Sequence, residues 1–143
     1  MLDFGSSEDE GFTPPMTRTT RLEEEPLAEA ALARLRSLGG EAVVQRIFSI
    51  VLDQVPLRLA VAEAGLATGD LDAIRQAAHS LRSSAGNVGA TRLQEFAREL
   101  EENLVAGKSE EAAPGLGRLI AEWGLVRGQL LSHLDSPFEP KVW

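Results

Sequence analysis

The chain has 143 residues, a formal net charge of −8 and no cysteine. This length suits a single domain with one core, and a composition dominated by alanine and leucine favours helices over strands. The negative charge argues against binding nucleic acid, which needs a concentrated positive surface. The lack of cysteine excludes disulfides, thiolate metal sites and a cysteine nucleophile.

No segment is apolar for the roughly 20 residues of a membrane span, and the N-terminus lacks a signal-peptide pattern. We therefore expect a cytoplasmic protein that binds neither nucleic acid nor a membrane. Residues 1–20 are acidic and interrupted by glycine and proline, which predicts a disordered leader. Residues 136–143 contain two prolines and predict a C-terminal tail, so the folded domain is expected over residues 21–135.

The folded region begins with "EEEPLAEAALARLRSL", in which carboxylates and a proline precede apolar residues at helical spacing. This order predicts a first helix of about a dozen residues that ends at Gly39 and Gly40. A longer second helix is predicted from Glu41, and Pro56 is expected to bend it without ending it. The inward residues predicted for the two helices are Leu27, Ala31, Leu35 and Leu38, then Val44, Phe48, Val51, Val55, Leu59, Ala62 and Leu66.

The second half of the chain predicts three more helices joined by short turns. Asp70 is expected to cap the third helix, which Gly89 ends, and a fourth helix starts at about Ala90. Ser109 is expected to cap the last helix. The inward residues predicted for the three helices are Leu71, Ile74, Ala78, Leu81, Ala85 and Val88; Leu93, Phe96, Ala97, Leu100 and Leu104; and Leu116, Leu119, Ile120, Trp123, Leu130 and Leu134.

Short turns make consecutive helices antiparallel neighbours. The sequence therefore predicts an all-α fold, an antiparallel up-down-up-down four-helix bundle with a short additional N-terminal helix.

The third helix carries one of the two histidines. At about 100 degrees per residue, its apolar residues lie within about 80 degrees of one another, and His79 lies roughly 150 degrees from their centre. His79 is therefore expected to face solvent. Arg82 and Ser83 follow it by three and four residues and lean back over it, whereas Arg75 precedes it and leans away.

Weak helix formers follow this histidine: Ser83, Ser84, Gly86 and Asn87. Either the helix ends near Ser83 and these residues form a loop, or the helix continues and they form a surface with few side chains. The apolar stripe stays in phase through Val88, which favours the continuing helix. Such a surface would let another macromolecule approach the imidazole closely.

The segment "AAHSLRSSAGNVGATRL" resembles the signature of histidine-containing phosphotransfer (HPt) domains, roughly Ala-His-x-Leu-Lys-Gly-x-(Ala/Ser)-x-x-hydrophobic-Gly-Ala-x-x-Leu. The match has no gap through Leu93, and the similarity extends over about residues 27–134, including "LEE" at 100–102. Two positions differ from the family pattern. Arg82 replaces a lysine and keeps its charge, and Ser83 replaces a glycine, with Gly86 one turn further on.

The resemblance implies that His79 accepts a phosphoryl group from an aspartyl phosphate and passes it to a second receiver domain, while Arg82 neutralises phosphoryl charge. We expect Arg75, Gln76, Ser83 and Gly86 to contact the partner. The expected partners are receiver domains of response regulators or a hybrid sensor histidine kinase. The chain is expected to be a carrier rather than an enzyme, because it has no nucleotide-binding loop with which to phosphorylate His79 from ATP. It is also expected to be a monomer. It is expected to have no cofactor or metal of its own, with Mg²⁺ supplied by the receiver.

Three alternatives to a phosphoryl carrier can be compared with the sequence, and only the first of them stays open. The chain could be a non-phosphorylatable HPt-like interaction module that docks on a receiver or a sensor kinase and modulates it. A carboxylate-bridged metal enzyme requires Glu-x-x-His pairs, and the chain contains none. A coiled-coil adaptor is disfavoured because the helices are too short for sustained heptads. His133 is expected to be a surface residue favoured by the helix dipole rather than a second phosphorylation site.

Overall fold

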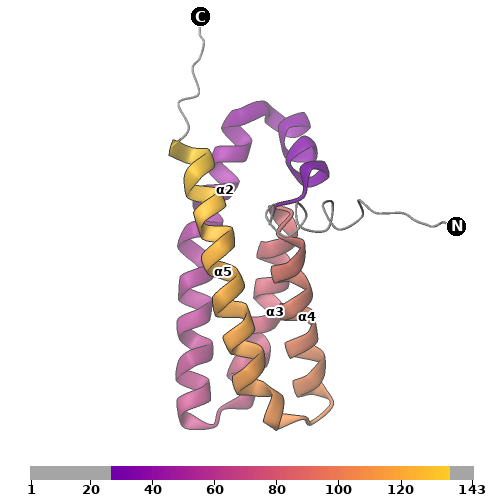
Figure 1. The fold of residues 1–143 in the computed structure, drawn as a ribbon, viewed down its shortest axis with the longest axis vertical. Helices are drawn as coiled ribbons and strands as arrows, with labels where there is room; N and C mark the ends of the chain where they lie inside the picture. Colours follow the sequence, from indigo (N-terminus) through magenta and orange to yellow (C-terminus); the bar gives the residue numbers. More distant parts are fainter. Residues whose placement is uncertain (1–26, 136–143) are drawn as a thin grey trace, which may run out of the picture.

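A computed structural model describes residues 27–135, which form an antiparallel bundle of four helices (Figure 1). The helices are α2 (Glu29–Thr68), α3 (Leu71–Asn87), α4 (Thr91–Val105) and α5 (Ala112–Asp135), with a 3-10 turn, η1 (Ser109–Glu111), before α5. The described residues contain no strand, so the predicted all-α four-helix bundle is confirmed. The predicted leader and tail lie outside the described residues.

Helix α2 consists of two helical segments separated at the predicted glycine pair. Gly39 and Gly40 have non-helical backbone angles, and Gly40 has a φ of 72°, which favours glycine. The segment before the pair is the predicted short N-terminal helix, and Figure 1 shows it crossing the open end of the bundle. Beyond the pair, α2 continues through Pro56 to Thr68, as predicted.

The short N-terminal segment is attached to the turn between α3 and α4. The backbone N–H of Ala28 donates to the carbonyl of Gly89 at 2.7 Å. Gly89 has a φ of 74°, and a Cβ there would lie 2.6 Å from the Cβ of Ala31. Both observations require glycine at this turn, and they confirm that Gly89 follows the end of α3.

The ends of the other helices agree with the prediction in one case and differ in another. The Asp70 carboxylate accepts a hydrogen bond from the N–H of Ala73 at 3.1 Å, so it caps α3 as predicted. The prediction for Ser109 was wrong, because this residue begins η1 and α5 starts only at Ala112. Instead, the 3-10 turn leads directly into α5, and backbone hydrogen bonds stabilise it.

The core lies between the four helices, which pack as a ring in the order α2, α3, α4, α5 and back to α2. Four residues predicted to point inward are exposed instead: Leu38, Leu66, Leu71 and Ile120. The first three lie at helix ends, where the rest of the bundle covers them incompletely, and Ile120 lies at the edge of its stripe. The remaining predicted inward residues are fully or partly buried. None of the described helices is long and apolar enough to cross a bilayer.

Candidate functional site

His79 lies in the middle of α3 on the outer surface of the bundle. Its side chain is 69% exposed, whereas the neighbouring Ala78 and Leu81 are buried in the core. Helix α3 continues without a break through Ser83, Ser84 and Gly86 to Asn87, so these weak helix formers do not form a loop. The structure therefore confirms both the outward direction of His79 and the continuing helix.

A carboxylate from the next helix contacts the histidine. Nδ1 of His79 lies 2.9 Å from Oε2 of Glu101 on α4, and only 13% of the Glu101 side chain is exposed. An ionised carboxylate can only accept a hydrogen bond, so this contact assigns the ring proton to Nδ1. In the neutral ring, Nε2 then keeps its lone pair.

Glu101 also binds the arginine predicted to belong to the site. Nη1 of Arg82 donates to Oε1 of Glu101 at 2.7 Å, so one carboxylate holds both side chains. Burial alone would raise the pKa of Glu101, but the hydrogen bonds from Arg82 and His79 outweigh burial and lower it below its usual value. Glu101 is therefore ionised at neutral pH, as the assignment of the ring proton requires.

His79 opens onto a shallow pocket of about 280 Å³ lined by His79, Arg82, Ser83 and Gln94. Gln94 comes from α4 and covers part of the neighbouring α3 surface, since a Cβ on Gly86 would lie 2.7 Å from Nε2 of Gln94. The structure thus brings His79, Arg82 and Ser83 together and places Gly86 beneath a polar side chain. The lack of a side chain at Gly86 leaves the space that Gln94 occupies.

The two remaining predicted site residues precede His79 on α3 and share one partner. Arg75 donates to Oδ1 of Asp72 from Nε at 3.0 Å and from Nη2 at 2.8 Å. Gln76 donates to Oδ2 of the same carboxylate at 2.7 Å. These contacts hold Arg75 and Gln76 against their own helix. Their predicted contact with a partner remains a prediction.

Sequence reasoning missed Glu101 and Gln94. Glu101 belongs to the "LEE" segment that matches the family, and it follows the buried Ala97 by four residues, which places it at the edge of the α4 stripe. This position was a usable signal that Glu101 borders a neighbouring helix. Which neighbour it borders depends on the order of the helices around the bundle, and this order is a property of the tertiary fold.

No group of three or more histidine, aspartate or glutamate side chains within residues 27–135 is arranged to hold a metal ion. The site therefore consists of one exposed imidazole, one guanidinium and the carboxylate that joins them. Together with the helical bundle, this arrangement defines a candidate histidine site for group transfer on a protein surface.

The comparisons with known proteins agree with this class. The sequence model of the Hpt domain matches residues 46–135, so the chain belongs to the Hpt domain family. The fold is similar to the crystal structure of histidine-containing phosphotransfer protein B (HptB) from Pseudomonas aeruginosa PAO1, with a TM-score of 0.73 and 26% sequence identity over 78% of this chain and 96% of that chain. No curated protein sequence matches this chain. The protein is a histidine phosphotransfer protein of phosphorelay signalling.

Proposed function

We propose that this protein carries a phosphoryl group on Nε2 of His79 between the aspartates of two receiver domains. The observation that carries the proposal is the exposed imidazole whose Nδ1 is held by Glu101, because this contact leaves Nε2 free for a partner. A neutral imidazole with an accessible lone pair is a competent nucleophile near neutral pH.

Each transfer has a simple balance of bonds. On acceptance, the Nε2 lone pair forms the bond to phosphorus, the bond between phosphorus and the aspartate oxygen breaks, and the carboxylate leaves with the electron pair. On release, an aspartate oxygen of the second receiver bonds to phosphorus, the P–N bond breaks, and its electron pair returns to Nε2. Phosphoryl transfer needs mainly in-line positioning and neutralisation of the phosphoryl oxygens. Arg82 uses Nη1 to bind Glu101, and a guanidinium has five N–H donors, so further donors can turn to the phosphoryl group.

The receiver supplies the rest of the transfer site in this proposal, including Mg²⁺. The chain is then a carrier without autokinase activity. Ser83 lines the same pocket as His79, and this supports the proposal that its hydroxyl donates to a phosphoryl oxygen. Arg75 and Gln76 are proposed to contact the receiver around this centre, whereas Gly86 is proposed to contribute by leaving the space that Gln94 occupies beside the pocket. A monomeric state and a cytoplasmic location remain predictions.

Incubation with a receiver domain phosphorylated on its aspartate tests the proposal. We expect the label to move to this protein as an acid-labile, alkali-stable adduct, and then to a second unphosphorylated receiver. His79→Gln should abolish the adduct, and the matched variant His133→Gln should retain it. An adduct that persists in His79→Gln would overturn the assignment. Receiver binding without any adduct would identify an interaction module instead.

A further inference from the structure

Two pairs of residues face each other where α3 and α4 lie side by side and antiparallel (Figure 1). The first pair is His79 and Glu101, which are joined by a hydrogen bond. The second pair is Gly86 and Gln94, because a Cβ on Gly86 would lie 2.7 Å from Nε2 of Gln94. Each residue of the second pair lies seven residues from its counterpart in the first, so the pairs are two helical turns, about 10 Å, apart.

The pocket beside His79 reaches from the first pair to the second. Arg82 and Ser83 line it from α3, and Gln94 lines it from α4. Arg82 is bonded to Glu101 and so belongs to the first pair. The rest of the lining consists of the Ser83 hydroxyl and the Gln94 amide, which carry no charge.

Gly86 is not needed for the backbone of α3. It lies within the continuous helix and is not one of the glycines with a positive φ, so its backbone conformation is open to any residue. Glycine is also less favourable than alanine inside a helix. The three nearest atoms that a Cβ would meet there all belong to the side chain of Gln94. The missing side chain at Gly86 therefore serves the position of the Gln94 amide.

The Gln94 amide in turn gains no bond from this position. The residue is exposed, and its side chain makes no hydrogen bond to any group among residues 27–135. A primary amide has two N–H donors and a carbonyl acceptor. All of them are available to a molecule that covers the pocket.

We propose that Gln94 binds the main chain of the receiver domain, about 10 Å along the helices from His79, and that Gly86 leaves the space in which this amide lies. The proposal rests on the phosphoryl-carrier function of His79. It makes Gln94 a residue that docks the partner, with no contact to the phosphoryl group.

The chemistry around Gln94 favours a peptide group over a charged side chain of the partner. A peptide group offers one N–H and one C=O, and a primary amide can pair with both at once. The charged groups of the site, Arg82 and Glu101, are bonded to each other at the His79 end of the pocket. Glu95, the charge next to Gln94 on α4, is bonded to Arg98. The Gln94 end therefore has no unpaired charge to attract an opposite one.

Two substitutions test the amide and its position separately. Gln94→Ala removes the amide. Gly86→Ala keeps the amide but moves it, because the new methyl group would overlap the end of a flexible side chain. In the double variant the methyl group has nothing to displace, so Gly86→Ala should have no further effect when residue 94 is alanine.

Matched controls are available on α5, which lies across the bundle from α3. Gln129→Ala removes the same exposed side chain as Gln94→Ala. Gly124→Ala adds the same methyl group to an exposed helical glycine, where a Cβ would meet no atom within 4 Å.

The experiment measures transfer from a receiver domain phosphorylated on its aspartate to the full-length protein, over a range of concentrations of this protein. In Gln94→Ala and Gly86→Ala we expect the concentration at half-maximal rate to rise about threefold to tenfold, as for the loss of one hydrogen bond. The maximal rate should be unchanged. Phosphorylation by phosphoramidate, a small donor that needs no docking surface, should match the wild type in both variants, and both controls should match it with either donor.

A wild type that takes no phosphoryl group on His79 from either donor would overturn the carrier function itself. A normal wild type, with an unchanged half-maximal concentration in Gln94→Ala, would overturn only the role of Gln94. An equal loss with phosphoramidate would also contradict it, because the substitution would then act on His79 and not on docking. A further loss from Gly86→Ala in the Gln94→Ala background would show that Gly86 does not act through the amide. Circular dichroism of each variant checks that the helices are intact.

Discussion

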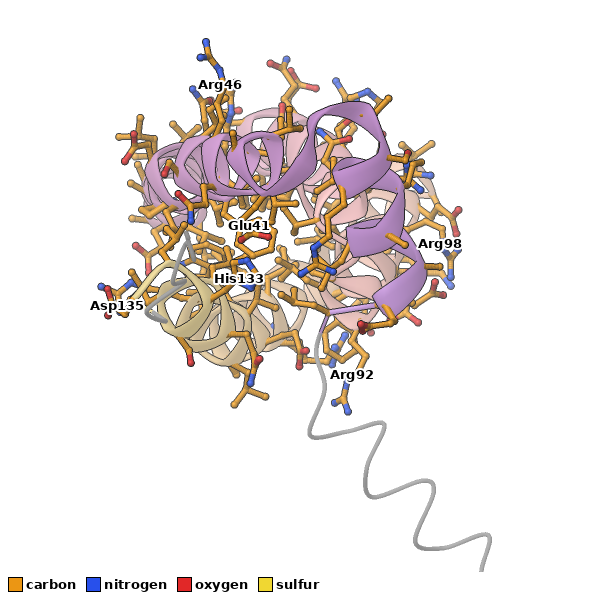
Figure 2. All side chains as sticks on the ribbon, turned by 90° about the horizontal axis from the view of Figure 1, so that it is seen from above. Glu41, Arg46, Arg92, Arg98, His133 and Asp135 are labelled. Carbon is orange, nitrogen blue, oxygen red and sulfur yellow. The ribbon has the colours of Figure 1, made fainter. Side chains whose placement is uncertain are left out.

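The molecule contains two histidines, and each contacts a glutamate that also binds an arginine. On the outer face of the bundle, at the middle of α3, His79 and Arg82 share Glu101. At the open end His133 of α5 contacts Glu41 of α2, which lies 3.4 Å from Nε of Arg36. Figure 2 shows Glu41 and His133 facing each other inside that end of the bundle. The same three residue types thus occur twice in very different surroundings.

The two arrangements differ in exposure and in the nitrogen that is bound. The His133 side chain is 24% exposed and packs edge-on against Phe48, with ring centroids 5.1 Å apart, whereas His79 is 69% exposed. Glu41 contacts Nε2 of His133, and Glu101 contacts Nδ1 of His79. His133 does lie in the last turn of α5, where the helix dipole favours it, but it is half-buried against α2 and is not the open surface residue that we predicted. The pair of His133 and Glu41 connects α5 to α2 in partly buried surroundings. The pair of His79 and Glu101 lies on the outer face and leaves Nε2 of His79 accessible.

The largest expected difference in stability separates the two faces of α3. Leu81 is fully buried, and we expect Leu81→Ala to lower the free energy of unfolding by about 2 to 5 kcal/mol. His79→Ala should change it by less than about 0.5 kcal/mol, because an exposed imidazole buries little surface. Thermal and urea unfolding measure both. Equal losses in the two variants would contradict the assignment of the helix faces.

An intermediate loss of stability is expected for His133, at the open end of the bundle. His133→Ala removes the aromatic contact with Phe48 and the pairing with Glu41, so we expect a loss of about 1 to 2 kcal/mol. His79→Ala serves as the matched control, since it deletes the same side chain from an exposed position. If the two histidine variants unfold at the same denaturant concentration, the structural difference between the two sites has no energetic consequence.

The smallest expected effects are on the pH dependence of stability, and they have opposite signs for Glu101 and Glu122. The pKa of Glu101 is lowered in the folded protein because the hydrogen bonds from Arg82 and His79 outweigh burial. Its contribution to stability is therefore present above pH 4.5, the usual pKa, and is lost as the pH falls through the lowered pKa. Burial raises the pKa of Glu122, which is 4% exposed, despite Arg92 at 3.6 Å. The contribution of Glu122 to stability is therefore present below pH 4.5, the usual pKa of glutamate, and is lost as the pH rises through the raised pKa.

At about pH 7 we therefore expect Glu101→Gln to lower the melting temperature and Glu122→Gln to raise it by a few degrees or less. Both differences from the wild type should shrink as the solution is acidified, because the carboxyls of the wild type then become protonated. Melting curves at several pH values measure the effect. The same sign for both variants at neutral pH would show that pairing, and not burial, controls Glu122.

Local sequence chemistry predicted most of the helical framework. The break at Gly39 and Gly40, the cap at Asp70 and the turn at Gly89 each depend on the backbone preferences of one or two residues. Apolar spacing placed Leu81 inside and His79 outside, because the period of a helix fixes which residues share a face. These features need no knowledge of the neighbouring helices.

The errors occur where a neighbouring element decides the outcome. Leu38 and Leu71 continue an apolar period, but they lie at helix ends where the rest of the bundle does not bury them. Ser109 has the right side chain for a cap, yet the 3-10 turn makes the entry to α5 with backbone hydrogen bonds. His133 was predicted at the surface because its own helix says nothing about Phe48 and Glu41 on α2.

The sequence by itself determined that this protein is a helical bundle with an outward His79 followed by Arg82, because helix period and turn chemistry are local properties. Only the tertiary structure decided that Glu101 joins them and that Glu41 binds the other histidine. These contacts span 22 and 92 residues, and they exist because antiparallel packing brings helix edges together. The arrangement of the helices therefore decides which ring nitrogen of each histidine contacts a glutamate.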